Sequence, residues 1–429
     1  MIDSAPLTGQ QMPKSLAIDA LIDQFKPGME IYIAGAGGES PALIDALRAR
    51  PDAARGVRFT SVGIPGANRF CYADLHPSAR LRSFFLSPEQ RAAFSAEKLD
   101  LLPLNYSAIS QYLERTSFDL VLFQGLPNER GYGLSIAADF TVAALRRARS
   151  SAVFVNPNLP HTSAPTVAFG DVRYEVTAAA ELPHYHPGEL SSAYAVLGEV
   201  IAGAIPNSAT LQLGPGKIQG AVARALHNHR DLRIHSGMVS DPLIALVMSG
   251  AIAAPRSSSP PIITGVALGS AKLYELLAEP SLARFEPVSY THSPLNLAAL
   301  PDLVAVNAVV EVDLTGQVNA EMVRGQQVSG AGGIADFVLG ARLSWGGRSI
   351  LATPATAADG ALSRIVPSLA QGTPVTVTRA EVDCIATEFG IARLRGLSLD
   401  QRAQALIAIA DPRFRYVLTK AWREQRKKW

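Results

Sequence analysis

The sequence predicts an α/β fold made of two similar open α/β domains with mostly parallel sheets. Short apolar runs alternate with helical patterns along most of the chain, which is typical of strands and helices that build a parallel sheet. A strand that ends in a glycine elbow and turns into a helix occurs twice, after Ile33 and after Leu213, roughly 180 residues apart. The polar, proline-bearing stretch Glu181–Gly188 lies between the two copies. We therefore expect one domain over residues 1–186 and a second over 187–429.

The first half predicts strands that are short, apolar and separated by helical patterns. Strands are expected at Glu30–Ile33, Val57–Val62, Leu81–Phe85, Leu101–Pro103, Leu120–Phe123 and Ala152–Val155, and helices over Ala42–Arg50 and Phe140–Arg149. Ser40 and Pro41 fit the N-cap and first-turn positions of the first of these helices.

The second half repeats this order of elements. Helices are expected over Ser192–Ala204, Ile218–Leu226 and Leu399–Ile409, the last capped by Ser398, and strands over Thr210–Leu213, around His235, over Val304–Val312 and over Ile350–Ala352.

Composition limits the class of partner. The chain has 429 residues, 48% of them apolar and 18% charged, which is enough core-forming material for two domains. A net charge of +2 provides no strong field to attract nucleic acid or an anionic membrane, so small molecules or proteins are the expected partners.

Cysteine usage and the N-terminus indicate a soluble, cytoplasmic protein. Cys71 and Cys384 lie far apart and form no disulfide framework, which fits a reducing compartment. The segment Met1–Lys14 lacks the pattern of a secretory signal, and no apolar run approaches the ~18 residues of a membrane span. The pair His184 and His186 lacks a third ligand, so no metal is expected.

Two glycine-rich segments are candidate ligand cradles. Gly214-Pro215-Gly216-Lys217 ends a strand and opens a helix, so its backbone N–H groups point to a place that suits a phosphate or an oxyanion, although a simple tight turn explains the pattern equally well. Ile218 rules out a Walker motif, and the late third glycine, Gly220, makes a nicotinamide-dependent oxidoreductase the least favoured class. The small residues between Val328 and Asp336 allow close approach of a ligand, or form a β-bulge or helix start.

Several segments in the same order along the chain resemble the acetyl-CoA hydrolase/transferase family, the class I CoA-transferases that include 4-hydroxybutyrate CoA-transferases. These segments are Asn156–Thr162, Ala209–Lys217, Ile234–Asp241, Asn307–Gln317, Ser329–Phe337 and Thr387–Ala392. The resemblance implies the CoA-transferase fold, an active site in the cleft between the halves, coenzyme A or acyl-CoA as substrate with an acceptor, and a homo-oligomer. It also implies that CoA is held by Gly214, Gly216 and Lys217 at the elbow and by Ala331, Gly332, Gly333 and Ala335 in the loop, whose N–H groups polarise the thioester carbonyl.

One departure from the family pattern decides the expected mechanism. The family reads His-Ser-Glu-Met where this chain reads His235-Ser236-Gly237-Met238. Relatives attack the acyl-CoA with that glutamate and pass through an acyl anhydride and a glutamyl-CoA thioester. Gly237 has no side chain to carry either intermediate, so this route is closed.

Three residues are candidates for a replacement. His235 could act as a general base, although a histidine at a strand end is more often structural. Glu39, on the first elbow, would face the cleft, or simply stabilise a helix N-terminus. Asp241 matches a family residue and is more readily explained as structural. We therefore expect direct acyl or CoA transfer from a short acyl-CoA without a glutamyl-CoA intermediate, with an acyl-CoA hydrolase or an inactive CoA-binding homologue as alternatives.

Overall fold

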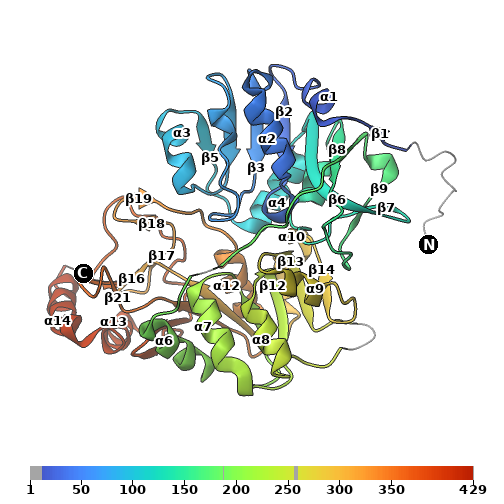
Figure 1. The fold of residues 1–429 in the computed structure, drawn as a ribbon. Coiled ribbons are helices and arrows are strands. Elements are labelled where there is room, and N and C mark those ends of the chain that lie inside the picture. Colours follow the sequence, from blue (N-terminus) through green and yellow to red (C-terminus); the bar gives the residue numbers. More distant parts are fainter. Residues whose placement is uncertain (1–11, 187, 256–258, 429) are drawn as a thin grey trace.

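The chain forms two lobes that lie one above the other in Figure 1. The computed structural model describes residues 12–186, 188–255 and 259–428. Most of Met1–Lys14, together with Pro187 at the predicted domain boundary, lies outside the described residues. The boundary itself stays a prediction.

The upper lobe contains a large sheet built from the first part of the chain. Within the described residues it has ten strands: β1 (Lys14–Ser15), β2 (Glu30–Ile33), β3 (Arg58–Ser61), β4 (Arg80–Ser83), β5 (Leu99–Leu101), β6 (Leu120–Asn128), β7 (Gly131–Gly133), β8 (Ser151–Val155), β9 (Thr166–Ala168) and β10 (Tyr174–Thr177). The main path runs β1-β10-β8-β6-β2-β3-β4-β5, and every neighbouring pair in it is parallel. Only the β7 pairings with β6 and β9 are antiparallel in this described part.

The lower lobe contains a second sheet of the same kind. Its described strands are β11 (Thr210–Leu213), β12 (Arg233–Val239), β13 (Ile262–Ala267), β14 (Ala283–Phe285), β15 (Leu303–Ala308), β20 (Arg348–Ala352), β24 (Cys384–Thr387) and β25 (Gly390–Arg393). They follow the order β14-β13-β12-β11-β15-β20-β24-β25, and of the pairings described β24 with β25 is the antiparallel one. The prediction of mostly parallel sheets is confirmed.

The two sheets share one strand order. In the first, β10-β8-β6-β2-β3-β4-β5 follow one another, and in the second β24-β20-β15-β11-β12-β13-β14 do so. In both sheets the first of these seven strands along the chain, β2 or β11, is the middle one and precedes a glycine elbow. The next three strands are added outward on one side of it, and the last three are added on the other side. The repeated strand, elbow and helix of the sequence therefore mark two copies of one topology.

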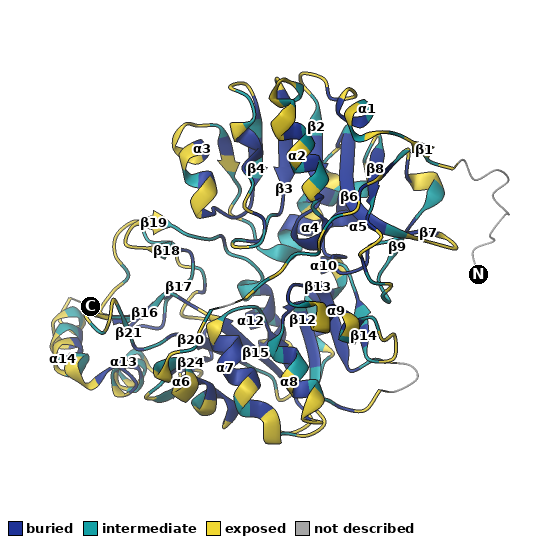
Figure 2. Cartoon of the chain, viewed as in Figure 1, coloured by how far each residue is buried: buried dark blue, intermediate teal, exposed yellow. Residues whose placement is uncertain are grey.

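Helices cover both sheets, and exposed faces alternate with buried strands in Figure 2. The upper lobe has α1 (Ile18–Ile22), α2 (Pro41–Ala49), α3 (Arg91–Ser95), α4 (Tyr106–Arg115) and α5 (Thr141–Leu145). The lower lobe has α6 (Ser192–Ala202), α7 (Lys217–Ala225), α8 (Pro242–Met248), α9 (Ala271–Leu277), α10 (Val288–Thr291), α11 (Pro294–Ala298), α12 (Ile334–Leu343), α13 (Leu399–Ala408) and α14 (Pro412–Arg426). No helix in the described ranges is both long and apolar enough to cross a bilayer.

The predicted helices and strands differ from the structure most in four places. The strand expected over Leu101–Pro103 lies two residues earlier, since β5 covers Leu99–Leu101, and the strand expected to end at Phe123 continues in β6 to Asn128. The helix expected over Phe140–Arg149 is shorter, since α5 ends at Leu145. The strand expected over Val304–Val312 is wrong as a single element. It divides into β15 and β16 (Glu311–Asp313), because the chain leaves the main sheet and pairs with β17 (Val318–Asn319) and β23 (Ile365–Val366).

A small extension of the lower lobe carries the remaining short strands. It holds β16, β17, β18 (Met322–Val323), β19 (Gln326–Gln327), β21 (Thr356–Ala357), β22 (Leu362–Ser363) and β23, beside α13 and α14. Ser398 caps α13, where its side chain accepts the backbone N–H of Gln401. The cap predicted at Ser398 is confirmed.

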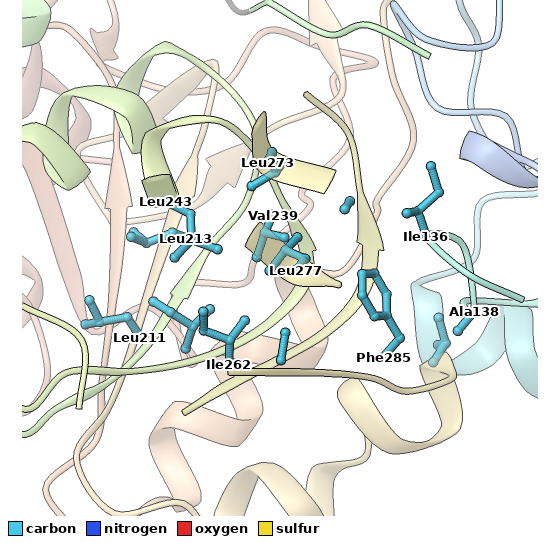
Figure 3. Packing of buried hydrophobic residues seen from close by; sticks show 14 of the residues in the cluster. Ile136, Ala138, Leu211, Leu213, Val239, Leu243, Ile262, Leu273, Leu277 and Phe285 are labelled. Carbon is cyan, nitrogen blue, oxygen red and sulfur yellow. The ribbon is translucent and has the colours of Figure 1, made fainter. Parts of the chain in front are cut away.

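Apolar packing runs continuously from one lobe into the other. One buried cluster includes Ile136 and Ala138 of the upper lobe with Leu211, Leu213 and Phe285 of the lower (Figure 3). Burial of this apolar surface is the main stabilising contribution to the fold.

Main-chain hydrogen bonds join the lobes at the same place. The N–H of Ala138 donates to the carbonyl of Gly265 at 2.9 Å, and the N–H of Ala267 donates to the carbonyl of Ile136 at 3.0 Å. The N–H of Val288 donates to the carbonyl of Asp139 at 2.9 Å. These bonds place α10 directly under the upper lobe.

Candidate functional site

The first glycine elbow fixes Glu39 in a network of hydrogen bonds. Asn68 donates to Oε2 of Glu39 at 2.7 Å, and the Tyr72 hydroxyl donates to Oε1 at 2.8 Å. Gln124, on β6, donates to the backbone carbonyl of Glu39 at 2.8 Å. Burial raises the pKa of Glu39, and the bonds from Asn68 and Tyr72 partly offset the rise. The carboxylate is therefore held firmly in one orientation.

Glu39 lines a cavity of about 350 Å³ together with Arg48, Arg69 and Gln124. All described residues that line it lie between positions 36 and 183, in the upper lobe. A separate apolar contact links the elbow to the lower lobe, since Ala36 and Met238 belong to one small buried cluster. The structure thus brings the first elbow beside Met238, the residue that follows Gly237, but neither Gly237 nor Met238 is among the residues that line the Glu39 cavity.

The second elbow begins α7, as the sequence predicts. Gly216 is its N-cap with a φ of 129°, a conformation that favours glycine. Lys217 is exposed in the first helical turn, with Nζ 5.9 Å from the centroid of the Tyr194 ring. Gly214 borders a small apolar pocket with Leu243. The N–H groups and the lysine can meet an anionic ligand at this helix start.

His235, on β12, is buried, with 3% of its surface exposed. Its Nε2 lies 3.0 Å from the carbonyl oxygen of Thr291, so Nε2 carries the proton and donates. Its ring stacks on Tyr290 with centroids 6.0 Å apart. Burial lowers the pKa of His235 to about 4, despite the opposing effect of the Thr291 bond. The ring is neutral near neutral pH and braces the end of α10, and its predicted role as a base stays a prediction.

The carboxylate of Asp241 accepts hydrogen bonds from Ser270 at the start of a neighbouring helix. Its Oδ1 accepts the backbone N–H and the hydroxyl of Ser270, the N-cap of α9, at 2.8 and 2.9 Å. This satisfies two donors at the beginning of α9.

The glycine loop before α12 crosses to the upper lobe. A Cβ added to Gly330 would lie 2.1 Å from the carbonyl oxygen of Phe84, so only glycine fits there. Gly332 has a φ of 60°, and its carbonyl accepts the N–H of Tyr106 at 3.1 Å. Ala331, Gly333 and Ala335 are partly buried in the same segment. The loop therefore joins the two lobes, and its predicted role in holding CoA stays a prediction.

Asp336 anchors this loop to the start of α4. Its Oδ2 accepts the backbone N–H of Ser107 at 3.1 Å, and its Oδ1 accepts the Ser107 hydroxyl at 2.6 Å and the Asn105 amide at 2.5 Å. Burial raises the pKa of Asp336 to about 6, offset in part by these bonds.

The place beside Gly237 is occupied by a residue that the sequence analysis did not identify, His292. A Cβ built on Gly237 would lie 2.4 Å from Cε1 and 2.9 Å from Nε2 of His292. A Cβ built on Gly333 would lie 2.6 Å from the same Nε2. The rings of Tyr106 and Phe337 close the remaining sides, with centroids 4.8 and 4.7 Å from that of His292. The imidazole thus fills a space that both glycines leave open.

His235, Gly237 and the glycine loop therefore converge on His292. The described contacts of Glu39, Gly214 and Lys217 are with other residues. Nothing local marks the segment Thr291-His292-Ser293-Pro294 as functional. Among the described residues no three His, Cys, Asp or Glu side chains gather in a way that could hold a metal ion.

The two-lobed α/β fold with a glycine loop at the junction between its lobes fits the CoA-transferases that the sequence resembles, and comparison with known proteins shows the family. Residues 269–422 match the family model of the acetyl-CoA hydrolase/transferase C-terminal domain. The chain is 33% identical to a 4-hydroxybutyrate coenzyme A transferase of Clostridium kluyveri, over 96% of this chain and 98% of that one. It is 33% identical to a succinyl-CoA:cyclohexane-1-carboxylate CoA transferase of Geobacter metallireducens, over 91% of this chain and 90% of the relative.

Solved structures show the same fold. The crystal structure of RipA from Yersinia pestis superposes with a TM-score of 0.88 at 28% identity, covering 96% of this chain and 98% of RipA. The chain belongs to the acetyl-CoA hydrolase/transferase family.

Proposed function

We propose that this protein consumes a short acyl-CoA by direct transfer to an acceptor, without a glutamyl-CoA intermediate. The observation that carries the proposal is the environment of Gly237: it has no side chain, and the ring of His292 lies where one would begin. An enzyme-bound acyl anhydride needs a carboxylate at the acyl carbon, and position 237 provides none.

CoA is expected to bind through main-chain amides at two helix starts. The elbow Gly214–Lys217 offers N–H groups and one exposed ammonium group for the phosphates of CoA. The loop from Ala331 to Ala335 begins α12, whose N-terminal N–H groups suit the oxyanion that develops on a thioester carbonyl. The relatives named above are CoA transferases, which supports a CoA ester as the substrate of this chain too.

The acceptor requires activation, because the enzyme forms no covalent intermediate of its own. The candidate bases that the sequence predicts are Glu39 and His235. Glu39 is ordered by Asn68 and Tyr72 and lines a cavity, whereas the Nε2 of His235 is committed to Thr291. Water as acceptor makes the protein an acyl-CoA hydrolase, and an organic acceptor makes it an acyltransferase.

Mass spectrometry combined with a thiol assay tests the proposal. The full chain is incubated with acetyl-CoA or butyryl-CoA, free CoA is measured with a thiol reagent, and the intact protein mass is recorded. We expect CoA release above an enzyme-free control and no adduct of CoA on the protein. A CoA adduct on a glutamate contradicts the direct route.

A second candidate function is that of a CoA-binding protein without catalysis. The observation that favours it is the burial of His292, which is 1% exposed and fills the space beside Gly237. Tight binding of acyl-CoA with no release of CoA above the control identifies this case.

A further inference from the structure

Resting on the proposed function, we infer that His292 takes the place of the missing carboxylate as the general base of the site, and that the acceptor is therefore a protic nucleophile, water or a hydroxyl compound. The position of the ring supports this role. The ring of His292 lies between Gly237 and Gly333, and a Cβ at either position would come within 2.6 Å of it. Gly237 stands at the family's nucleophile position and Gly333 belongs to the loop expected to hold the thioester carbonyl. The imidazole therefore lies between these two parts of the site.

The hydrogen bonds of His292 leave one ring nitrogen free. Its Nδ1 lies 2.9 Å from Oγ1 of Thr291, and this hydroxyl also bonds the carbonyl of Pro287 at 3.4 Å. The hydroxyl of Thr291 can accept a proton from Nδ1 or donate one to it, and the proposed role of His292 uses the tautomer in which Nδ1 donates to Oγ1 while the hydroxyl points to Pro287. Nε2 then carries a lone pair, and no described residue donates a hydrogen bond to it. This nitrogen is the one that faces Gly333.

The ring is held by contacts that reach back to His235. The Nε2–H of His235 donates to the carbonyl of Thr291, the residue that precedes His292 and bonds its Nδ1. Tyr106 and Phe337 pack against the ring from the upper lobe and from α12. His235 is therefore a positioning residue in this arrangement. Burial, with a smaller effect from His235, lowers the pKa of His292 to about 3, so the ring is neutral near neutral pH. The same shift makes the buried ring a weak base, so its proposed role requires that the oxyanion formed in the reaction stabilise the imidazolium.

A base in this position determines the class of acceptor. A carboxylate acceptor has no proton to give up, so a base contributes nothing to its attack. Water or an alcohol loses a proton as its oxygen attacks, and Nε2 takes that proton. The chemistry of His292 thus favours hydrolysis or acyl transfer to a hydroxyl over exchange of CoA between two acids.

The reaction balances without a further reactant. The oxygen of water bonds to the thioester carbonyl carbon while Nε2 of His292 takes its proton. The tetrahedral oxyanion collapses, the C–S bond breaks, and the imidazolium returns the proton to the CoA sulfur. The products are a carboxylic acid and the CoA thiol, and the imidazole ends neutral as it began.

Substitution of His292 by an amide tests the role of the ring nitrogen. In His292→Asn and His292→Gln, the basic ring nitrogen is lost while a polar side chain remains. We expect kcat for CoA release to fall by about 100-fold or more, the range of general-base catalysis, while the Kd for acyl-CoA changes little. His227→Asn, the same change at an exposed histidine on the lower lobe, is the matched control and should keep wild-type rates. Wild-type kcat in a folded amide variant overturns the inference and leaves the proposed function standing.

Chemical rescue separates catalysis from packing. His292→Ala opens the space that the ring fills, so added imidazole is expected to restore part of kcat in this variant and in no control. Absence of rescue, with imidazole shown to bind, argues for a packing role of His292 and against the inference.

The wild-type protein provides a test that does not depend on any variant folding. Acyl-CoA is mixed with a carboxylate acceptor, such as acetate or succinate, in water enriched in oxygen-18. We expect one labelled oxygen in the released acid and no new CoA ester of the added carboxylate. Formation of that second CoA ester overturns the inference, whereas binding of acyl-CoA with no turnover overturns the proposed function itself.

Discussion

The carboxylate of Asp336, at the start of α12, accepts both the backbone N–H and the hydroxyl of Ser107, at the start of α4. This pair joins the two lobes beside the glycine loop, because Gly332 bonds the neighbouring Tyr106 through its carbonyl. The position of the loop that is expected to hold the thioester is therefore set from the opposite lobe.

Replacing Ser107 by alanine should loosen this junction. The substitution removes the 2.6 Å bond to Asp336 and leaves a buried carboxylate with fewer donors. We expect the free energy of unfolding in urea to fall by about 1–3 kcal/mol and the affinity for CoA to fall with it. Ser281→Ala, which removes an exposed hydroxyl bonded to Glu279, is the control and should change neither quantity much. Equal effects of the two substitutions contradict the predicted role.

Restoring a glutamate at position 237 should fail unless His292 is made smaller. In Gly237→Glu the new Cβ lies 2.4 Å from a ring atom of His292, so strain should lower the melting temperature without giving any CoA transfer to acetate. His292→Ala alone leaves a cavity, and the double variant combines the new side chain with the vacated space. We expect the double variant to be more stable than the sum of the two single effects by about 1–3 kcal/mol, measured as a double-mutant cycle. Additive effects would show that the ring moves aside freely.

The buried carboxyl of Asp139 should make stability depend on pH. Burial raises the pKa of Asp139 to about 7 from an ordinary value of 3.8, and the backbone N–H of Phe140 opposes the rise. Between these values the folded chain holds a proton that the unfolded chain has lost. Stability should therefore fall as the pH rises from about 4 to about 7, and the full cost is present above that range.

Asp139→Asn removes this cost while it keeps an acceptor for Phe140. We expect the variant to exceed the wild type in unfolding free energy at pH about 8 by up to about 4 kcal/mol, and the difference to shrink towards pH about 4. Denaturant titrations at several pH values measure it. A difference that is the same at every pH contradicts the assignment of the raised pKa.

Lys217 should contribute to CoA affinity by its charge. The ammonium group is exposed in the first turn of α7, next to Gly216, where it can reach a phosphate. Lys217→Ala is expected to weaken CoA binding about tenfold in calorimetry at low salt, with a smaller effect at high salt. Lys272→Ala, at the start of α9, is the matched control. Unchanged affinity in the Lys217 variant would move the phosphate site away from the second elbow.

The sequence predicts the layout of the fold well where local signals coincide. The strands Glu30–Ile33 and Thr210–Leu213 have the bounds that the structure gives, because a glycine elbow ends each apolar run. The pairing of β7 with β6 and β9 was not predicted, since the Gly131–Gly133 strand carries no alternation of its own. The sequence predicts one strand where the structure has β15 and β16, because apolar residues continue from Val304 to Val312 although their pairing partners change.

The parts of the site that carry a local glycine pattern could also be predicted from the sequence. The elbow at Gly216 and the loop at Gly332 are visible as glycine patterns, and both have positive φ in the structure. His292 could not be found in this way, because its importance lies in contacts with Gly237 and Gly333, which lie far from it in the sequence. Only the packing of β12, α10 and α12 around one ring brings these three residues together.

The tight fit of one imidazole between two residues without Cβ atoms has an evolutionary consequence. A lineage that gained the bulky ring first would have lost the room for its carboxylate, and one that lost the carboxylate first would have left a hole. Among homologues, a glutamate at the position of Gly237 and a histidine at that of His292 should therefore exclude one another, and the two positions should change as a pair.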